Sequence, residues 1–163
     1  MALSHPAAGL AFAVAIILLD QVSKYVVLST LDPWTPIAVT SFFNLVLVWN
    51  RGVSFGIMSN AGDHGPWLLT GLTLVIVAAL AVWLRRERRF LSRVALWMVI
   101  AGALGNLIDR LRFGAVVDFL DFHIAGYHWP AFNVADSAIS IGAVLLLADS
   151  LFSTRPVLDQ AGR

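Results

Sequence analysis

The sequence predicts a mainly α-helical membrane protein, with four transmembrane helices and a small β-sheet on the outer membrane surface. Of its 163 residues, 59% are hydrophobic and only 13% are charged, and the mean hydropathy is +0.81. Soluble domains carry about 25% charged residues, so this chain has too few charges to cover a soluble surface. Disordered chains combine low hydrophobicity with high charge, which excludes that class as well. Because each span needs about 20 apolar residues, the length allows roughly four spans and modest loops.

Four apolar segments form the expected spans, which cover residues 8–28, 66–84, 94–111 and 133–152. A cleaved signal peptide is the competing interpretation of the first segment. It is disfavoured because no basic region precedes the segment, no A-x-A site follows it, and Asp20 and Lys24 interrupt it. We expect a single membrane-embedded domain, residues 1–163, without a separate soluble part.

The distribution of basic residues predicts the orientation. Five of the eleven Lys and Arg residues fall between positions 85 and 93, in the loop between the second and third spans. The positive-inside rule makes this loop cytoplasmic. With four spans, both termini are then cytoplasmic, and residues 29–65 and 112–132 lie outside.

The first outer segment, residues 30–65, is β-rich. Residues 37–49 are rich in Val, Phe, Leu and Thr, which favours strands, and Asn50-Arg51-Gly52 is typical of a turn. A second short strand is expected at residues 53–58. The outer segment at 112–132 is interpreted as a very apolar loop that lies against the membrane or the sheet.

Polar side chains inside the spans are candidates for function, because burying them in lipid is costly. Asp20 and Lys24 are four residues apart, so they share a helix face and can pair. A buried ion pair that fixes helix packing is the simpler interpretation of these two. Asn106 and Arg110 also share a face, and with Asp109 they end the third span; a solvated helix end is the alternative for this group.

The fourth span begins with a polar stripe at three- and four-residue spacing, and Asp136 lies in its first turn. A carboxylate there either caps the helix and complements its dipole or takes part in chemistry, and this span alone favours neither. Asp149 lies near the other end and is expected to be a solvated end residue.

Asp118 and Asp121 lie in the apolar outer segment, where partial desolvation raises the pKa of a carboxyl group. Asp118 and Asp136 are joined by a loop that contains Gly126 and Pro130 and can fold back. Two carboxyl groups that share a site cannot both ionise readily, so one keeps a proton while the other acts as a base. Such a pair can activate a water for attack on an amide without a covalent intermediate.

The sequence gives weaker signals for other functions, such as serine hydrolysis or metal binding. Residues 52–56 match G-x-S-x-G, but chain breakers follow where a nucleophile elbow needs a helix. His123 and His128 have no specific metal-ligand spacing, the chain has no cysteine, and the net charge of +1 suggests no nucleic-acid partner. A small proton-coupled transporter that uses Asp20, Lys24 and Asp136 remains an alternative, although no inverted repeat is visible. A non-catalytic membrane scaffold is a further one.

Five short motifs, in order from Asp20 to Ile139, resemble the signature blocks of the lipoprotein signal peptidase family, the aspartic signal peptidases II of bacteria. The motifs are Asp20-Gln21-Val22-Ser23-Lys24, Asn50-Arg51-Gly52, Gly105-Asn106-Leu107-Ile108-Asp109-Arg110, Val116-Val117-Asp118-Phe119 and Phe132-Asn133-Val134-Ala135-Asp136-Ser137-Ala138-Ile139. One departure is Val53-Ser54 after the glycine of the second motif, where the family often has small residues.

The resemblance implies a multi-pass peptidase of the bacterial inner membrane, with its active site near the periplasmic face. It implies cleavage of prolipoproteins on the N-terminal side of a diacylglyceryl-modified cysteine, with membrane lipids as further partners. Asp118 and Asp136 would be the catalytic pair. Supporting roles are implied for Asp20, Lys24, Asn50, Gly52, Asn106, Asp109, Arg110 and Asn133. A monomer without metal or cofactor is expected.

Overall fold

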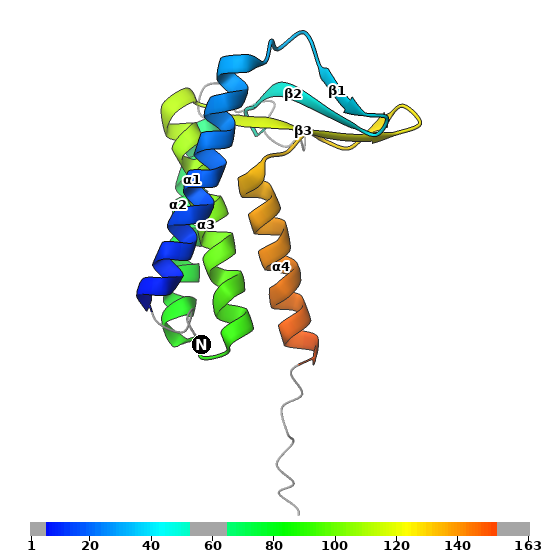
Figure 1. Ribbon diagram of the computed structural model, residues 1–163. Helices are drawn as coiled ribbons and strands as arrows, with labels where there is room; N and C mark the ends of the chain where they lie inside the picture. Colours follow the sequence, from blue (N-terminus) through cyan, green and yellow to red (C-terminus); the bar gives the residue numbers. More distant parts are fainter. Residues whose placement is uncertain (1–5, 53–64, 153–163) are drawn as a thin grey trace, which may run out of the picture.

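The computed structural model describes residues 6–52 and 65–152, and these contain the four expected helices (Figure 1). The helices are α1 (Pro6–Thr30), α2 (Gly65–Arg86), α3 (Phe90–Phe113) and α4 (Val134–Phe152). Each is long and apolar enough to cross a membrane, which confirms the predicted four-span fold. The expected strand at 53–58 and most of the G-x-S-x-G match lie outside the described residues.

Helix α3 is the centre of the bundle and packs against α1, α2 and α4. In its most apolar 18-residue stretch 56% of the residues are buried, against 22% or less in the other three helices. Small residues allow this close packing, as expected for helices in lipid. Gly102 lies against the backbone of Ala135, and a Cβ at Gly142 would lie 2.8 Å from the carbonyl oxygen of Ala95.

A four-stranded antiparallel sheet lies at one end of the bundle (Figure 1). Its order is β1 (Ile37–Thr40), β2 (Phe43–Asn50), β3 (Val116–Ile124) and β4 (Tyr127–His128). The strand-rich stretch 37–49 is thus a hairpin. A buried cluster of Val27, Leu47, Val117 and Phe119 holds the sheet against α1.

The interpretation of residues 112–132 as a loop was wrong for β3 and β4. Strand β3 pairs with β2 so that Asp118 lies opposite Val48 and Val116 opposite Asn50. The first four residues of β3 are all buried. Because both faces are covered there, the strand is an apolar run without the alternation that marks a half-buried strand.

Asp149 was expected to be solvated, and this was also wrong. Its side chain is only 10% exposed, accepts a hydrogen bond from Ser92 Oγ, and lies 3.4 Å from Arg89 Nε. The residues concerned are 57 and 60 positions away, so only the packing of α4 against α3 brings them to Asp149. These contacts tie α3 and α4 together at the end of the bundle opposite the sheet (Figure 1).

Gly142→Ala should destabilise the folded protein by about 1–3 kcal/mol, because the added methyl group would press on the α3 backbone. Gly71→Ala is the matched control, since a Cβ at Gly71 has no atom within 4 Å. Thermal unfolding of the detergent-solubilised variants measures the difference. Equal unfolding temperatures for the two variants would contradict close α3–α4 packing.

Candidate active site

A buried ion cluster lies where α1 meets α3. Lys24 Nζ lies 2.8 Å from Asp20 Oδ2 and 2.8 Å from Asp109 Oδ2, and none of the three side chains is more than 3% exposed. The predicted Asp20–Lys24 pair is confirmed. The alternative of a solvated helix end does not hold for Asp109, because helix packing encloses it.

Gln21 belongs to the same cluster, although sequence reasoning did not select it. Its Nε2 donates to Asp20 Oδ2 at 3.1 Å, to Asp109 Oδ1 at 3.0 Å and to the Gly105 carbonyl at 3.2 Å. An amide within an apolar span was the available signal. Its partners on α3 are 84 and 88 positions away and could not be read from local spacing.

The two carboxylates of the cluster also accept backbone N–H groups, one from α4 and one from β3. Asp20 Oδ1 accepts the backbone N–H of Ala135 at 2.9 Å, in the first turn of α4. Asp109 Oδ2 accepts the N–H of Val117 at 3.1 Å, near the start of β3. One ion cluster therefore positions both elements that carry the candidate catalytic carboxyl groups.

Asn133 and Asp136 cap the start of α4 reciprocally. The backbone N–H of Asp136 donates to Asn133 Oδ1 at 2.9 Å, and that of Asn133 donates to Asp136 Oδ2 at 3.2 Å. This is a capping box, which satisfies backbone donors at the helix start. The other oxygen, Asp136 Oδ1, accepts from Asn106 Nδ2 at 2.7 Å. Asp136 therefore both caps the helix and belongs to the polar site.

Amide side chains connect the ion cluster to the carboxyl groups. Asn106 Oδ1 accepts from Lys24 Nζ at 3.0 Å and from Asn133 Nδ2 at 3.1 Å. Asn133 Nδ2 also donates to Asp118 Oδ1 at 2.7 Å. Asn133 therefore bridges the two aspartates, through its backbone to Asp136 and through its side chain to Asp118.

Asp118 is a buried carboxyl group on β3, and its second oxygen accepts from Asn50 Nδ2 at 2.9 Å. Burial raises its pKa from 3.8 to about 6, and the charge of Asp136 acts in the same direction. Hydrogen bonds from Asn50 and Asn133 oppose the shift without cancelling it. The predicted effect of desolvation is therefore confirmed for Asp118.

The same prediction was wrong for Asp121. Burial alone would raise the pKa of Asp121, but hydrogen bonds from His128 and Asn44 hold it below the ordinary value. His128 Nδ1 lies 2.8 Å from Asp121 Oδ1, and Asn44 Nδ2 lies 2.9 Å from Oδ2. Side chains alternate along a strand, so residues three positions apart point to opposite faces. Asp118 and Asp121 therefore have different surroundings.

Gly52 shapes the turn that holds Asn50. Its φ of +84° lies in the left-handed region that favours glycine, and its N–H donates to Asn50 Oδ1 at 2.8 Å. With its oxygen committed to this bond, Asn50 directs its amide nitrogen to Asp118. Gly52 thus acts on the site through Asn50.

Arg110 lies half-buried in the last turns of α3. It forms no ion pair with the carboxylates of the described residues, yet it is attracted electrostatically by Asp136, Asp109 and Asp118. A guanidinium has five donors in a planar fork. Within residues 6–52 and 65–152 those donors form no hydrogen bond, so they are available to a bound molecule beside the two carboxyl groups.

Two adjoining cavities open at the aspartates. Asp118 lines a cavity of about 400 Å³ together with β2 residues. Asp136 lines a larger cavity of about 620 Å³ that follows α4. Asn50, Pro130 and Ala131 line both. A chain that passes from one cavity to the other would therefore run past both carboxyl groups.

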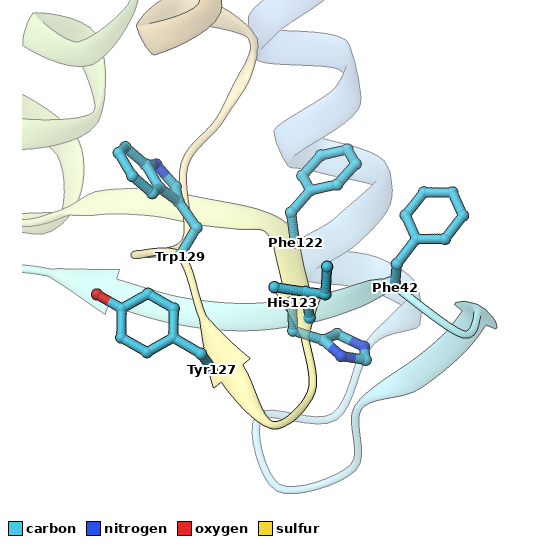
Figure 2. A pocket seen from close by; sticks show the side chains of 6 residues that line it. Phe42, Phe122, His123, Tyr127 and Trp129 are labelled. Carbon is cyan, nitrogen blue, oxygen red and sulfur yellow. The ribbon is translucent and has the colours of Figure 1, made fainter.

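A third cavity, of about 380 Å³, lies at the far end of the sheet. Figure 2 shows its aromatic walls, with the rings of Phe42 and Phe122 on the side of the sheet where the helices lie. Among the described residues that line it there is no carboxylate, and the titratable ones are His123 and Tyr127. The His123 and His128 rings stack 4.8 Å apart, and the described residues hold no group of three or more His, Asp or Glu suited to a metal ion. The carboxylate cavities are therefore the candidate active site.

Comparison with protein families gives a match over most of the chain. The family model described as signal peptidase (SPase) II matches residues 12–152. A lipoprotein signal peptidase of Burkholderia vietnamiensis is 47% identical over 159 residues, which cover 94% of this chain and 96% of the relative. One of Cupriavidus necator is 47% identical over 152 residues, covering 92% and 86% of the two chains.

Solved structures have the same fold. A bacterial membrane enzyme determined by the in meso method at 2.3 Å resolution has a TM-score of 0.82 and 32% identity, over 97% of this chain and 96% of that chain. A second, at 1.9 Å, has a TM-score of 0.81 and 34% identity, over 91% and 96%.

Lys24→Met should destabilise the protein by about 3–5 kcal/mol, because it leaves Asp20 and Asp109 buried without their shared cation. Arg88→Met removes a charge from an exposed loop residue and serves as the control. Denaturant or thermal unfolding in detergent measures both. If Lys24→Met unfolds at the same point as Arg88→Met, the ion cluster does not hold the bundle together.

Proposed function

The chain belongs to the signal peptidase II family, and on that basis we propose that it is an aspartic endopeptidase that removes the signal peptide from prolipoproteins. Its substrates are diacylglyceryl-modified, and the cleaved bond precedes the modified cysteine. Asp118 and Asp136 are the catalytic pair in this proposal. The alternative of a proton-coupled transporter has no support in the comparisons.

The observation that carries the assignment is the bridge through Asn133. It donates to Asp118 Oδ1 from its side chain and to Asp136 Oδ2 from its backbone. Each carboxyl group also lines a cavity, and the two cavities adjoin. Two carboxyl groups held in one network and open to bound molecules are what water activation requires.

The reaction proceeds with one proton shared between the pair. The ionised carboxylate removes a proton from a water, and the water oxygen attacks the carbonyl carbon of the scissile amide. The protonated carboxyl group gives its proton to the carbonyl oxygen, and a neutral gem-diol forms. The other carboxyl group then passes the proton it took from water to the amide nitrogen, while the first takes a proton back from a gem-diol hydroxyl. The C–N bond breaks, the amine of the cysteine leaves neutral, and the pair again holds one proton. The raised pKa of Asp118 suits a group that keeps a proton in this cycle.

The remaining polar residues position the pair. Asn50, Asn106 and Asn133 donate to the two aspartates, and Gly52 holds Asn50. The ion cluster of Asp20, Lys24 and Asp109 anchors α4 and β3. Arg110 binds a carbonyl oxygen of the substrate or a polar lipid group with its open donors.

We propose an orientation with both termini cytoplasmic and the active site at the outer, periplasmic face. The five arginines of residues 85–93 lie in the last turn of α2, the short loop and the first turns of α3, at the end of the bundle opposite the sheet (Figure 1). The enzyme works as a single-domain monomer, and the acyl chains of the substrate stay in the bilayer.

Asp118→Asn and Asp136→Asn should each lower cleavage of a diacylglyceryl prolipoprotein by roughly a thousandfold or more, because an amide cannot exchange the catalytic proton. Asp121→Asn is the matched control on the same strand, and it should keep activity within severalfold. Cleavage is followed by the mobility shift of the product, and thermal unfolding checks the fold. Full activity of either Asp118→Asn or Asp136→Asn would exclude the pair.

The pH dependence of kcat/KM should have a basic limb that starts near pH 6. The pKa of Asp118 is raised, so its proton is held up to about pH 6 and is lost as the pH rises further. Without that proton the pair has a base but no acid, and kcat/KM falls by about tenfold per pH unit. Asn50→Ala should move the limb to higher pH, since the hydrogen bond from Asn50 lowers this pKa. A rate that stays constant from pH 5 to 8 would contradict the assignment.

A further inference from the structure

The cavity beside Asp136 extends along α4 away from the sheet. Its α4 wall consists of Asp136, Ser137, Ser140 and Ile141, which share one helix face at three- and four-residue spacing. The segment that precedes α4 forms the facing wall, with Trp129, Pro130, Ala131 and Phe132. The cavity therefore begins at a proposed catalytic group and continues beside a membrane-spanning helix.

The two serines on this wall differ in their hydrogen bonding. Ser137 Oγ donates to the Asn133 carbonyl at 2.9 Å, as serines in helices often do toward the preceding turn. Ser140 is an exposed residue, and its hydroxyl has no hydrogen-bond partner among residues 6–52 and 65–152. Within the apolar part of a membrane a free hydroxyl is unfavourable, so a polar partner from a bound chain would stabilise it.

An extended substrate supplies that kind of partner. A signal peptide that enters from the membrane must leave its helical form near the cleaved bond, because an amide inside a helix is enclosed by the helix backbone. Its freed N–H and C=O groups then need partners, since lipid offers none. A hydroxyl that both donates and accepts can serve either group.

The position of Ser140 along α4 determines which residue of an extended substrate it can contact. Ser140 follows Asp136 by four residues, which is about 6 Å along the helix axis. An extended chain advances about 3.3 Å per residue. A chain that places its scissile bond at Asp136 therefore has its backbone about two residues upstream at Ser140.

Building on the proposed function, we propose that the cavity along α4 binds the last residues of the signal peptide in extended form. The Ser140 hydroxyl hydrogen-bonds the peptide backbone about two residues before the cleaved bond. The cavity at Asp118, which β2 lines outside the spans, receives the modified cysteine side of the bond. The signal peptide thus lies on the Asp136 side and the released amine on the Asp118 side.

The first test is Ser140→Ala, assayed with a diacylglyceryl prolipoprotein in detergent micelles. Loss of one substrate hydrogen bond should lower kcat/KM about three- to tenfold, mainly through KM. Ser140→Thr keeps the hydroxyl and should recover most of the loss. Ser150→Ala makes the same change at an exposed site near the other end of α4 and should match the wild type. Equal kcat/KM for Ser140→Ala and Ser150→Ala would overturn the proposal.

The second test locates the contact along the substrate. Ser140→Phe narrows the cavity. Two substrates are compared that carry Gly or Leu two residues before the cleaved bond. The ratio of kcat/KM for the Gly substrate to that for the Leu substrate should be at least about fivefold larger for Ser140→Phe than for the wild type. The same Leu-for-Gly exchange eight residues before the bond should show no added discrimination. Equal losses for all substrates would overturn the register. If Asp118→Asn and Asp136→Asn are inactive while Ser140 changes have no effect, only this inference fails and the proposed function stands.

Discussion

The fold and the site depend on one cation held between two buried carboxylates. Taking Lys24, Asp20 and Asp109 out of water costs several kcal/mol per ion, and the cost is offset only by close geometry and further hydrogen bonds. Both conditions hold, since each ion pair measures 2.8 Å and each carboxylate accepts an additional backbone N–H. Those N–H groups belong to the first turn of α4 and the start of β3. Removal of the cation would therefore disturb both elements that carry the proposed catalytic groups.

The same cation determines how the amides of the site are oriented. An ammonium group only donates, so Asn106 must present its oxygen to Lys24 and its nitrogen to Asp136. Asn133 is oriented in turn, because its oxygen accepts the backbone N–H of Asp136 and leaves its nitrogen for Asp118. A chain of committed donors and acceptors thus runs from the ion cluster to both aspartates. Such networks are rigid when every member is satisfied.

The membrane explains why the rest of the molecule consists of a loosely covered helix bundle with a sheet at one end. Of the four helices in the described part of the chain, α3 is the one enclosed on several sides, and the other three leave most of their residues uncovered by the rest of the protein, as spans that face lipid do. The sheet closes one end of the bundle, and the aspartates lie where sheet and helices meet. Water and a membrane-embedded substrate can reach the same carboxyl groups only at such a boundary. The two adjoining cavities, one lined by β2 and one by α4, reflect this position.

The sequence by itself determined the features that rest on composition and local spacing. These are the four spans, the Asp20–Lys24 pair at i,i+4, the strand character of residues 37–49, and the motifs that led to Asp118 and Asp136. The tertiary structure alone decided that residues 116–124 form a strand, that Asp109 is buried, that Asp149 is paired and largely shielded from solvent, and that Gln21 joins the ion cluster. It also decided that the pKa of Asp121 is lowered, whereas the raised pKa of Asp118 follows from its apolar segment. The physical reason is common to all of these. Burial and hydrogen-bond partners come from other elements, often more than 50 positions away, and the pattern of residues along one segment does not contain them.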